Sequence, residues 1–314
     1  MRERQTDPRI EAARAVRILL IGPSGQIGRE LQGALPAVGE VVTAGRTGDA
    51  IPLDLTSAAS IREAVRSTPA DIIVNAAAYT AVDQAETDRD TAFAVNAEAP
   101  GVLAECAKSA GSLLVHFSTD YVFDGAAARA YTEDDETNPL SVYGRSKLAG
   151  EEAIRASGGR HLILRTSWVY GLHGKNFLLT MLRLASEQKT LNVVNDQFGV
   201  PNWSRALAIA TASSIASLFA ERDRIDERTG TYHLSAAGET TWYGFAQAIL
   251  DSVRGEPGIV AHTVNPIGTD EFPTPAPRPA RSTLNGARIE RVLGVTLPDW
   301  RVCVQQCLGE RAVG

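Results

Sequence analysis

The chain has 314 residues, enough for one large domain or two modest ones, with 44% hydrophobic and 22% charged residues as in ordinary globular proteins. A net charge of −6 argues against nucleic-acid binding, which needs a basic face, but not against an anionic small ligand. Three cysteines are too few for a disulfide framework, and no apolar run has the length of a membrane span or the pattern of a secretory signal. We therefore expect a cytoplasmic protein with no membrane partner.

The first half of the chain alternates short apolar runs with helical patterns. Residues 1–15 are polar and predict a flexible N-terminal extension. Strands are expected at residues 16–22, 41–44, 71–75, 112–118 and 161–165, with helices at 26–35, 61–67, 90–110 and 143–156. Strand alternating with helix predicts an α/β fold, a Rossmann-like doubly wound parallel sheet, which we expect to be an NAD(P)-binding domain over residues 16–170.

The pattern loosens in the second half. Strands are expected at residues 190–194 and 230–235, and helices at 177–187, 204–220, 289–293 and 300–308. Many prolines in residues 256–282 predict little regular structure there. We expect residues 171–314 to form mainly a smaller substrate-binding lobe, with some segments returning to the Rossmann sheet.

A glycine-spaced turn follows the first predicted strand. Gly22, Gly25 and Gly28 stand between a strand and a helix, a context in which backbone N–H groups approach a pyrophosphate. A carboxylate after the second strand would bind the ribose 2′-hydroxyl of NAD, but this chain has Arg46 there. Arg46 suits the 2′-phosphate of NADP, or is a solvated surface arginine. We predict NADPH as the cofactor and keep NADH as the alternative.

A second signal lies about 120 residues further along. Tyr143 and Lys147 are four residues apart and share one face of a predicted helix. A nearby ammonium lowers the pKa of a phenol, so that it exchanges a proton more readily at neutral pH. Thr119 ends a predicted strand, where α/β sheets bind ligands, and its hydroxyl would bond the same carbonyl oxygen. This set predicts reduction or oxidation of a carbonyl or alcohol centre with a nicotinamide.

These motifs resemble the extended short-chain dehydrogenase/reductase group and, within it, the family of dTDP-4-dehydrorhamnose reductases. The resemblance covers about residues 16–308. It is carried by the stretches 22–28, 75–86, 118–125, 143–151, 165–170, 195–201, 273–276 and 278–279. It implies NADPH-dependent reduction of the C4 ketone of dTDP-4-dehydro-β-L-rhamnose, a dTDP-4-dehydro-6-deoxyhexose.

The resemblance also implies a role for individual residues. Thr119, Tyr143 and Lys147 would be the catalytic triad, with Tyr143 and Lys147 also contacting the cofactor and Thr119 and Tyr143 the substrate. The remaining cofactor contacts would be Gly22, Gly25, Gln26, Ile27, Arg46, Asp54, Leu55, Ala77, Ala78 and Thr80. The remaining substrate contacts would be Val82, Asp120, Tyr121 and Trp168.

The chain departs from the family pattern at Arg205. Some bacterial members carry a glutamate there, and Mg²⁺ joins it to other carboxylates at a dimer interface. Glu30 remains in this chain, but an arginine is not a metal ligand. We therefore expect no metal site, although the chain remains compatible with a homodimer. Arg281 is charged where many members have a smaller or neutral residue, and is either a phosphate contact or a surface charge.

Three alternatives share the fold. A 4,6-dehydratase or epimerase would need an additional acid/base pair after Thr119, but Tyr121 stands where a glutamate is usual. A non-catalytic regulatory subunit, like that of methionine adenosyltransferase, would not need the Thr119, Tyr143 and Lys147 set. A 4-ketoreductase of another nucleotide deoxysugar fits the same motifs.

Overall fold

The structure is a computed structural model that describes residues 15–46 and 48–311. The predicted N-terminal extension lies almost entirely outside these residues. Among them, no helix combines the length and apolar character needed to cross a membrane.

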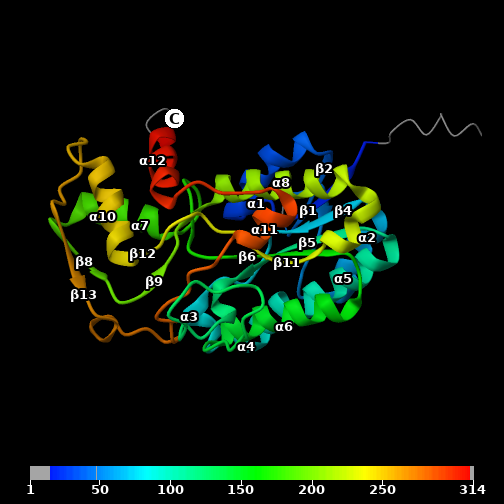
Figure 1. Cartoon of the computed structure of the whole chain (residues 1–314), viewed down its shortest axis with the longest axis horizontal. Helices are drawn as coiled ribbons and strands as arrows, with labels where there is room; N and C mark the ends of the chain where they lie inside the picture. Colours follow the sequence, from blue (N-terminus) through cyan, green and yellow to red (C-terminus); the bar gives the residue numbers. More distant parts are fainter. Residues whose placement is uncertain (1–14, 47, 312–314) are drawn as a thin grey trace, which may run out of the picture.

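A seven-stranded sheet forms the centre of the protein (Figure 1), and each of its neighbouring strand pairs is parallel. Its order is β11-β6-β5-β4-β1-β2-β3. The strands are β1 (Arg17–Ile21), β2 (Glu40–Gly45), β3 (Ile51–Pro52), β4 (Ile72–Asn75), β5 (Leu113–Thr119), β6 (His161–Thr166) and β11 (Gly230–His233). The order reverses beside β1, so the predicted doubly wound Rossmann-like fold is confirmed.

Helices cover both faces of the sheet (Figure 1). On one face, Ile18 and Leu20 pack into a cluster with residues of α1 (Gln26–Ala34), α8 (Ser204–Ala220) and α11 (Ala287–Leu293). On the other, Leu19 and Ile21 pack with residues of α2 (Ala58–Ser67), α5 (Ala99–Ala110) and α6 (Val142–Ser157). Successive β1 side chains therefore enter opposite cores, as expected for a strand buried on both sides.

A smaller lobe lies beside the sheet, at the left of Figure 1. Its parallel pair is β8 (Thr190–Val194) and β13 (Thr263–Ile267). A separate apolar core joins these strands to α7 (Phe177–Glu187), α10 (Trp242–Val253) and α12 (Trp300–Arg311). Four two-residue strands form two further pairs: β7 (Val169–Tyr170) is parallel to β10 (Asn202–Trp203), and β9 (Phe198–Gly199) is antiparallel to β12 (Thr240–Thr241). From the same half of the chain, β11 joins the central sheet beside β6.

Several elements differ from the sequence prediction, most of them short. The helix expected over residues 90–110 is α4 (Arg89–Phe93), a π-helical stretch (Ala94–Glu98) and α5. The proline-rich stretch contains β13, which pairs in parallel with β8 although it includes Pro266. Helix α10 was not predicted, because its start is rich in threonine and aromatic residues, which favour strands. The Thr241 hydroxyl accepts a hydrogen bond from the Gly244 N–H and begins the helix.

Candidate active site

The turn between β1 and α1 exposes backbone groups without side chains at the carboxyl end of β1. Gly22 adopts a left-handed conformation (φ 77°), and a methyl group there would lie 2.7 Å from Cβ of Ala77. A methyl group at Gly28 would collide with the carbonyl oxygen of Gly22. Gly25 precedes α1, and no side chain caps the first turn that contains Gln26 and Ile27. The turn therefore has the close approach and uncapped N–H groups that a diphosphate needs.

Two charged residues follow the next strands. Arg46 is exposed just after β2, and Asp54 is exposed just after β3. Hydrogen bonds from the Thr56 backbone (2.9 Å) and hydroxyl (2.8 Å), with a smaller effect of the nearby Arg46 charge, lower the pKa of Asp54. Leu55 packs against the core on the α2 side of the sheet. The Arg46 guanidinium and the Asp54 carboxylate thus lie near each other, in the part of the site predicted to hold the adenosine of the cofactor.

The loop after β4 runs from the glycine turn toward α3 (Val82–Ala85). Ala77 and Ala78 are half-buried, Thr80 is exposed, and Val82 is half-buried at the start of α3. The Ala77 N–H donates to Oδ1 of Asn75 at 3.2 Å. The predicted cofactor contacts of this loop therefore include one residue, Ala77, that touches the glycine turn.

Thr119 and Tyr143 meet at the carboxyl end of β5. Thr119 is the last residue of β5, and Tyr143 lies in the first turn of α6, which Ser141 caps. Burial raises the pKa of Tyr143 to about 12, while a hydrogen bond with Thr119 acts in the opposite direction. The phenol is therefore protonated and held beside the Thr119 hydroxyl, as a proton donor requires.

Lys147 lies one turn further along α6 and is almost completely buried (2% exposed). Its Nζ donates to the carbonyl oxygen of Phe117 at 2.7 Å and lies 3.0 Å from Nε2 of His116. Burial lowers the pKa of Lys147 to about 8, against the charge of Glu151. Sequence reasoning missed His116, although a polar side chain in an otherwise apolar buried strand is a recognisable signal.

Asp120 is a buried carboxyl at the same place (2% exposed). Its Oδ1 accepts from the Thr119 hydroxyl at 3.0 Å, and its Oδ2 has no hydrogen-bond partner among the described residues. Burial raises its pKa to about 7, against hydrogen bonds from Ser282 and Thr119. An unpartnered buried oxygen beside the proton donor is suited to a hydroxyl of a bound sugar.

Tyr121 and a C-terminal loop border this centre. The rings of Tyr121 and Tyr143 meet edge to face, with centroids 5.9 Å apart. Burial raises the pKa of Tyr121, and the positive charge of Arg278 acts in the opposite direction with a smaller effect. Arg278 bonds Asp83 of α3 through both nitrogens, at 2.6 and 2.8 Å. A charge pair between residues 195 positions apart therefore ties the C-terminal loop to the predicted substrate side.

Trp168 follows β6, whose last residue Thr166 pairs with Thr119 in the sheet. Its backbone has a φ of 42°, the only positive value at a non-glycine residue in the described chain. Its ring stacks on Trp242 of α10, with centroids 3.6 Å apart and an angle of 10° between the planes. Trp242 was not predicted from the sequence, because its helix was missed.

The departure at Arg205 has a structural counterpart. Arg205 bonds Glu30 at 2.8 Å and Glu310 at 2.5 Å, so a guanidinium stands between the two carboxylates. No three His, Cys, Asp or Glu side chains in the described residues are grouped as a metal site. The donor set at Arg205 does not fit Mg²⁺. Arg281 pairs with Glu239 at 2.9 and 2.8 Å, which gives its charge an internal partner.

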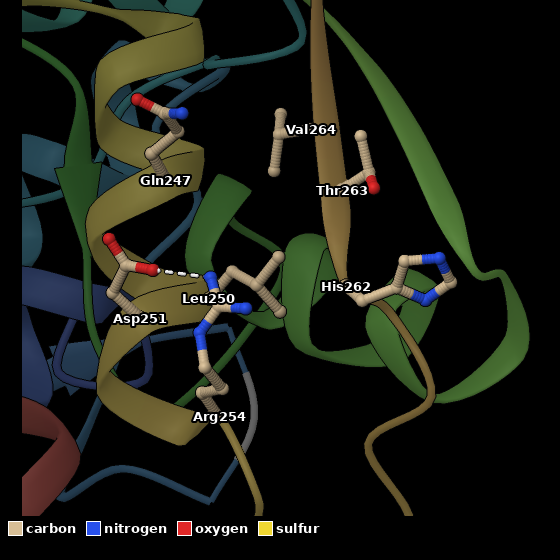
Figure 2. Close-up of a pocket in the computed structure, with 7 residues that line it drawn as sticks. All are labelled: Gln247, Leu250, Asp251, Arg254, His262, Thr263 and Val264. Carbon is tan, nitrogen blue, oxygen red and sulfur yellow. Dashed lines mark hydrogen bonds and ion pairs between the residues drawn. The ribbon is translucent and has the colours of Figure 1, made fainter.

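A surface hollow of about 180 Å³ lies elsewhere, between α10 and β13 (Figure 2). Gln247 and Asp251 of α10, with Arg254 directly after the helix, face His262, Thr263 and Val264. Asp251 and Arg254 form an ion pair of 2.7 Å on the helix side. None of the predicted site residues lines it. The hollow therefore plays no part in the candidate active site.

The sheet order, the glycine turn and the Tyr143–Lys147 helix define the class of extended short-chain dehydrogenases/reductases, which are NAD(P)-dependent oxidoreductases. The sequence model of the family described as "RmlD substrate binding domain" matches residues 16–313. The chain belongs to this family, that of the dTDP-4-dehydrorhamnose reductases, as predicted.

Individual relatives agree along nearly the full length. The dTDP-4-dehydrorhamnose reductase of Burkholderia thailandensis is 45% identical over 296 residues, covering 93% of this chain and 98% of the relative. That of Escherichia coli is 43% identical over 295 residues, covering 93% and 97%. The crystal structure of the Bacillus anthracis enzyme in complex with NADP has a TM-score of 0.83 and 32% identity, covering 94% of this chain and 99% of that one.

Proposed function

We propose that this protein is an NADPH-dependent reductase that converts the C4 ketone of dTDP-4-dehydro-β-L-rhamnose into the alcohol of dTDP-L-rhamnose. The observation that carries the proposal is the set of buried Thr119, half-buried Tyr143 and buried Lys147, together with a turn suited to a diphosphate. Membership of the family and the names of its members support the substrate and the cofactor.

The site residues have distinct roles in this proposal. Gly22 and Gly25 let the cofactor diphosphate approach the turn closely, and the uncapped N–H groups of Gln26 and Ile27 in the first turn of α1 bind it. Arg46 binds the adenosine 2′-phosphate, Asp54 and Leu55 border the adenine, and Ala77, Ala78 and Thr80 follow the dinucleotide. When bound, the reduced nicotinamide supplies a hydride to the sugar C4.

The chain's own groups complete the reaction. Thr119 orients the ketone through its hydroxyl, and Tyr143 gives its phenolic proton to O4 as the carbonyl becomes an alcohol. Lys147, as an ammonium, favours the phenolate left on Tyr143. Val82, Asp120, Tyr121 and Trp168 surround the sugar nucleotide, and the unpartnered Oδ2 of Asp120 accepts from a sugar hydroxyl.

We further propose that residues 16–170 hold the dinucleotide and that residues 171–314 mainly close over the sugar nucleotide. The protein would work in the cytoplasm, with its three cysteines as free thiols. If it forms a homodimer, the Arg205–Glu30–Glu310 cluster contributes ion pairs to it in place of a metal bridge.

The proposal is tested by following NADPH oxidation with a panel of 4-keto sugar nucleotides that differ in base, in the C2 hydroxyl and in C5 configuration. The dTDP-linked 6-deoxyhexulose is expected to have the highest kcat/KM. A higher value for a 2,6-dideoxy sugar would move the function to another nucleotide-deoxysugar 4-ketoreductase. No oxidation with any ketone, together with stable co-purification with a larger enzyme, would identify a regulatory subunit.

A further inference from the structure

We propose that His116 is a positioning residue that directs its Nε2–H at the Lys147 nitrogen, and so holds Lys147 as an uncharged amine while the dinucleotide is absent. The catalytic consequence rests on the proposed function, but the hydrogen-bond arrangement does not. His116 of β5 pairs in register with Asn75 of β4, which places the two side chains next to each other.

The direction of the hydrogen bonds starts at the backbone. The Ala77 N–H can only donate, and it lies 3.2 Å from Oδ1 of Asn75, so this oxygen accepts. The Asn75 amide nitrogen then faces Nδ1 of His116 at 3.1 Å. Because the amide nitrogen also only donates, Nδ1 of His116 must accept, and the single proton of a neutral imidazole is on Nε2.

The same logic sets the state of Lys147. Nε2 of His116 lies 3.0 Å from Nζ of Lys147. An ammonium has no lone pair to receive the Nε2–H, whereas an amine has one. The amine still donates to the Phe117 carbonyl at 2.7 Å, so both neighbours are satisfied. Burial holds the pKa of His116 well below its ordinary value, so the imidazole is neutral. Burial also lowers the pKa of Lys147 to about 8, which makes the uncharged amine easier to form than in water.

The other titratable groups near Lys147 are either paired with arginines or have a raised pKa. Glu151, one turn further along α6, raises the pKa of Lys147 by its charge. However, it is bound through both oxygens by Arg165 of β6, at 2.9 and 2.7 Å, and by Arg155 at 3.0 Å. Tyr143 stays protonated, since burial raises its pKa to about 12. Asp120, beyond Thr119, has its own pKa raised to about 7 by burial.

The tautomer of His116 is directly measurable. Long-range ¹H–¹⁵N correlation spectra of the cofactor-free protein distinguish Nε2–H from Nδ1–H imidazoles. Among the chain's five histidines, His116 and His233 are the two buried ones. The His116 signals are those that disappear in His116→Gln. Should that variant fail to fold, they are the buried-histidine signals that persist in His233→Asn. The expected result is the Nε2–H tautomer at neutral pH; an Nδ1–H or a doubly protonated ring would overturn the proposal.

A substitution at Asn75 reverses the arrangement. In Asn75→Asp, the new carboxylate accepts from Nδ1–H, so Nε2 becomes an acceptor for a Lys147 ammonium. The spectrum should change to the Nδ1–H form, and the alkaline limb of kcat/KM should move upward by about one pH unit, since the ammonium is stabilised. The matched control is Asn96→Asp, another fully buried asparagine that bonds Tyr79 and Ser146 instead.

Asn96→Asp should leave both the His116 tautomer and the alkaline limb of the kcat/KM pH profile unchanged. An Asn75→Asp protein that keeps the Nε2–H tautomer contradicts the inference, as does an equal change in both variants. Failure of the proposed function is a separate result: absent ketone reduction in the wild type would remove the pH profile, but the tautomer readout would still decide the role of His116.

Discussion

Trp168 and Trp242 stack almost face to face, although 74 residues separate them: Trp168 follows β6 of the central sheet, and Trp242 begins α10 of the smaller lobe. Two contacts fix the Trp242 ring in the stack. Its indole N–H donates to Oε1 of Gln197 at 3.2 Å, and the ring of Phe177 at the start of α7 packs against it with centroids 4.7 Å apart. Trp168 retains a positive φ at a cost of about 1–3 kcal/mol, so its neighbours hold it there.

Loss of the Trp242 ring should therefore weaken substrate binding more than chemistry. An aromatic pair contributes about 0.5–1.5 kcal/mol beyond burial, so Trp242→Leu should raise KM for the sugar nucleotide about three- to tenfold with kcat little changed. Steady-state kinetics at saturating NADPH measure this. Trp203→Leu, which removes an indole that contacts Arg205 instead, is the control. A fall in kcat alone would show that the stack does not hold the sugar.

Tyr143→Phe should abolish most proton transfer while preserving the pocket. Removing a general acid costs roughly 10²–10⁴ in rate. Single-turnover oxidation of NADPH should be slowed by this factor, and the affinity for NADPH should remain because the ring keeps its edge-to-face contact with Tyr121. Tyr121→Phe is the matched control. A near-wild-type rate in Tyr143→Phe would remove Tyr143 as the proton donor.

Arg46→Ala should change cofactor preference. The exposed Arg46 guanidinium follows β2, where it would pair with the 2′-phosphate of NADPH, so its loss should lower kcat/KM for NADPH about tenfold or more and leave that for NADH nearly unchanged. The ratio of the two efficiencies is the readout. Arg62→Ala, an exposed arginine of α2 paired with Glu105, should not change it. A wild type that prefers NADH would contradict the assignment.

Asp120 should make the folded protein less stable as pH rises. Its pKa is raised from 3.8 to about 7, so the folded state retains a proton that the unfolded chain has released. The stability present below pH 4 is lost as pH rises through about 7, by an amount on the order of 4 kcal/mol. Urea unfolding from pH 4 to 8 should show this loss in the wild type and not in Asp120→Asn.

The same replacement at Asp196 provides the opposite control. Hydrogen bonds from Thr269 lower the pKa of Asp196, so this carboxylate stabilises the fold above its unfolded pKa and loses that effect at acid pH. Asp196→Asn should therefore remove a gain in stability with rising pH. Identical pH curves for the wild type and Asp120→Asn would show that burial does not keep the Asp120 proton.

Local patterns in the sequence were enough to predict the sheet and the Tyr143–Lys147 pair, because strand and helix periods and an i, i+4 spacing are local properties. The partners of those residues depend on register and packing. His116 meets Asn75 only through the β4–β5 pairing, and Trp242 meets Trp168 only once α10 has formed. The threonines and aromatic residues at the start of α10 favour a strand locally. The segment is nevertheless a helix, because Thr241 caps its first turn and its apolar residues pack into the core of the smaller lobe.

Strand β11 is synthesised more than 60 residues after its sheet neighbour β6, which has a consequence for folding on the ribosome. Until Gly230–His233 emerges, β6 presents a row of unpaired backbone groups to other chains. At the opposite border, short β3 ends in Pro52, which offers no N–H to a neighbour. Translation proceeds at about 5–20 residues per second, so the nascent polypeptide is exposed on one flank for several seconds. Chaperones that shield extended segments would be needed most during that interval.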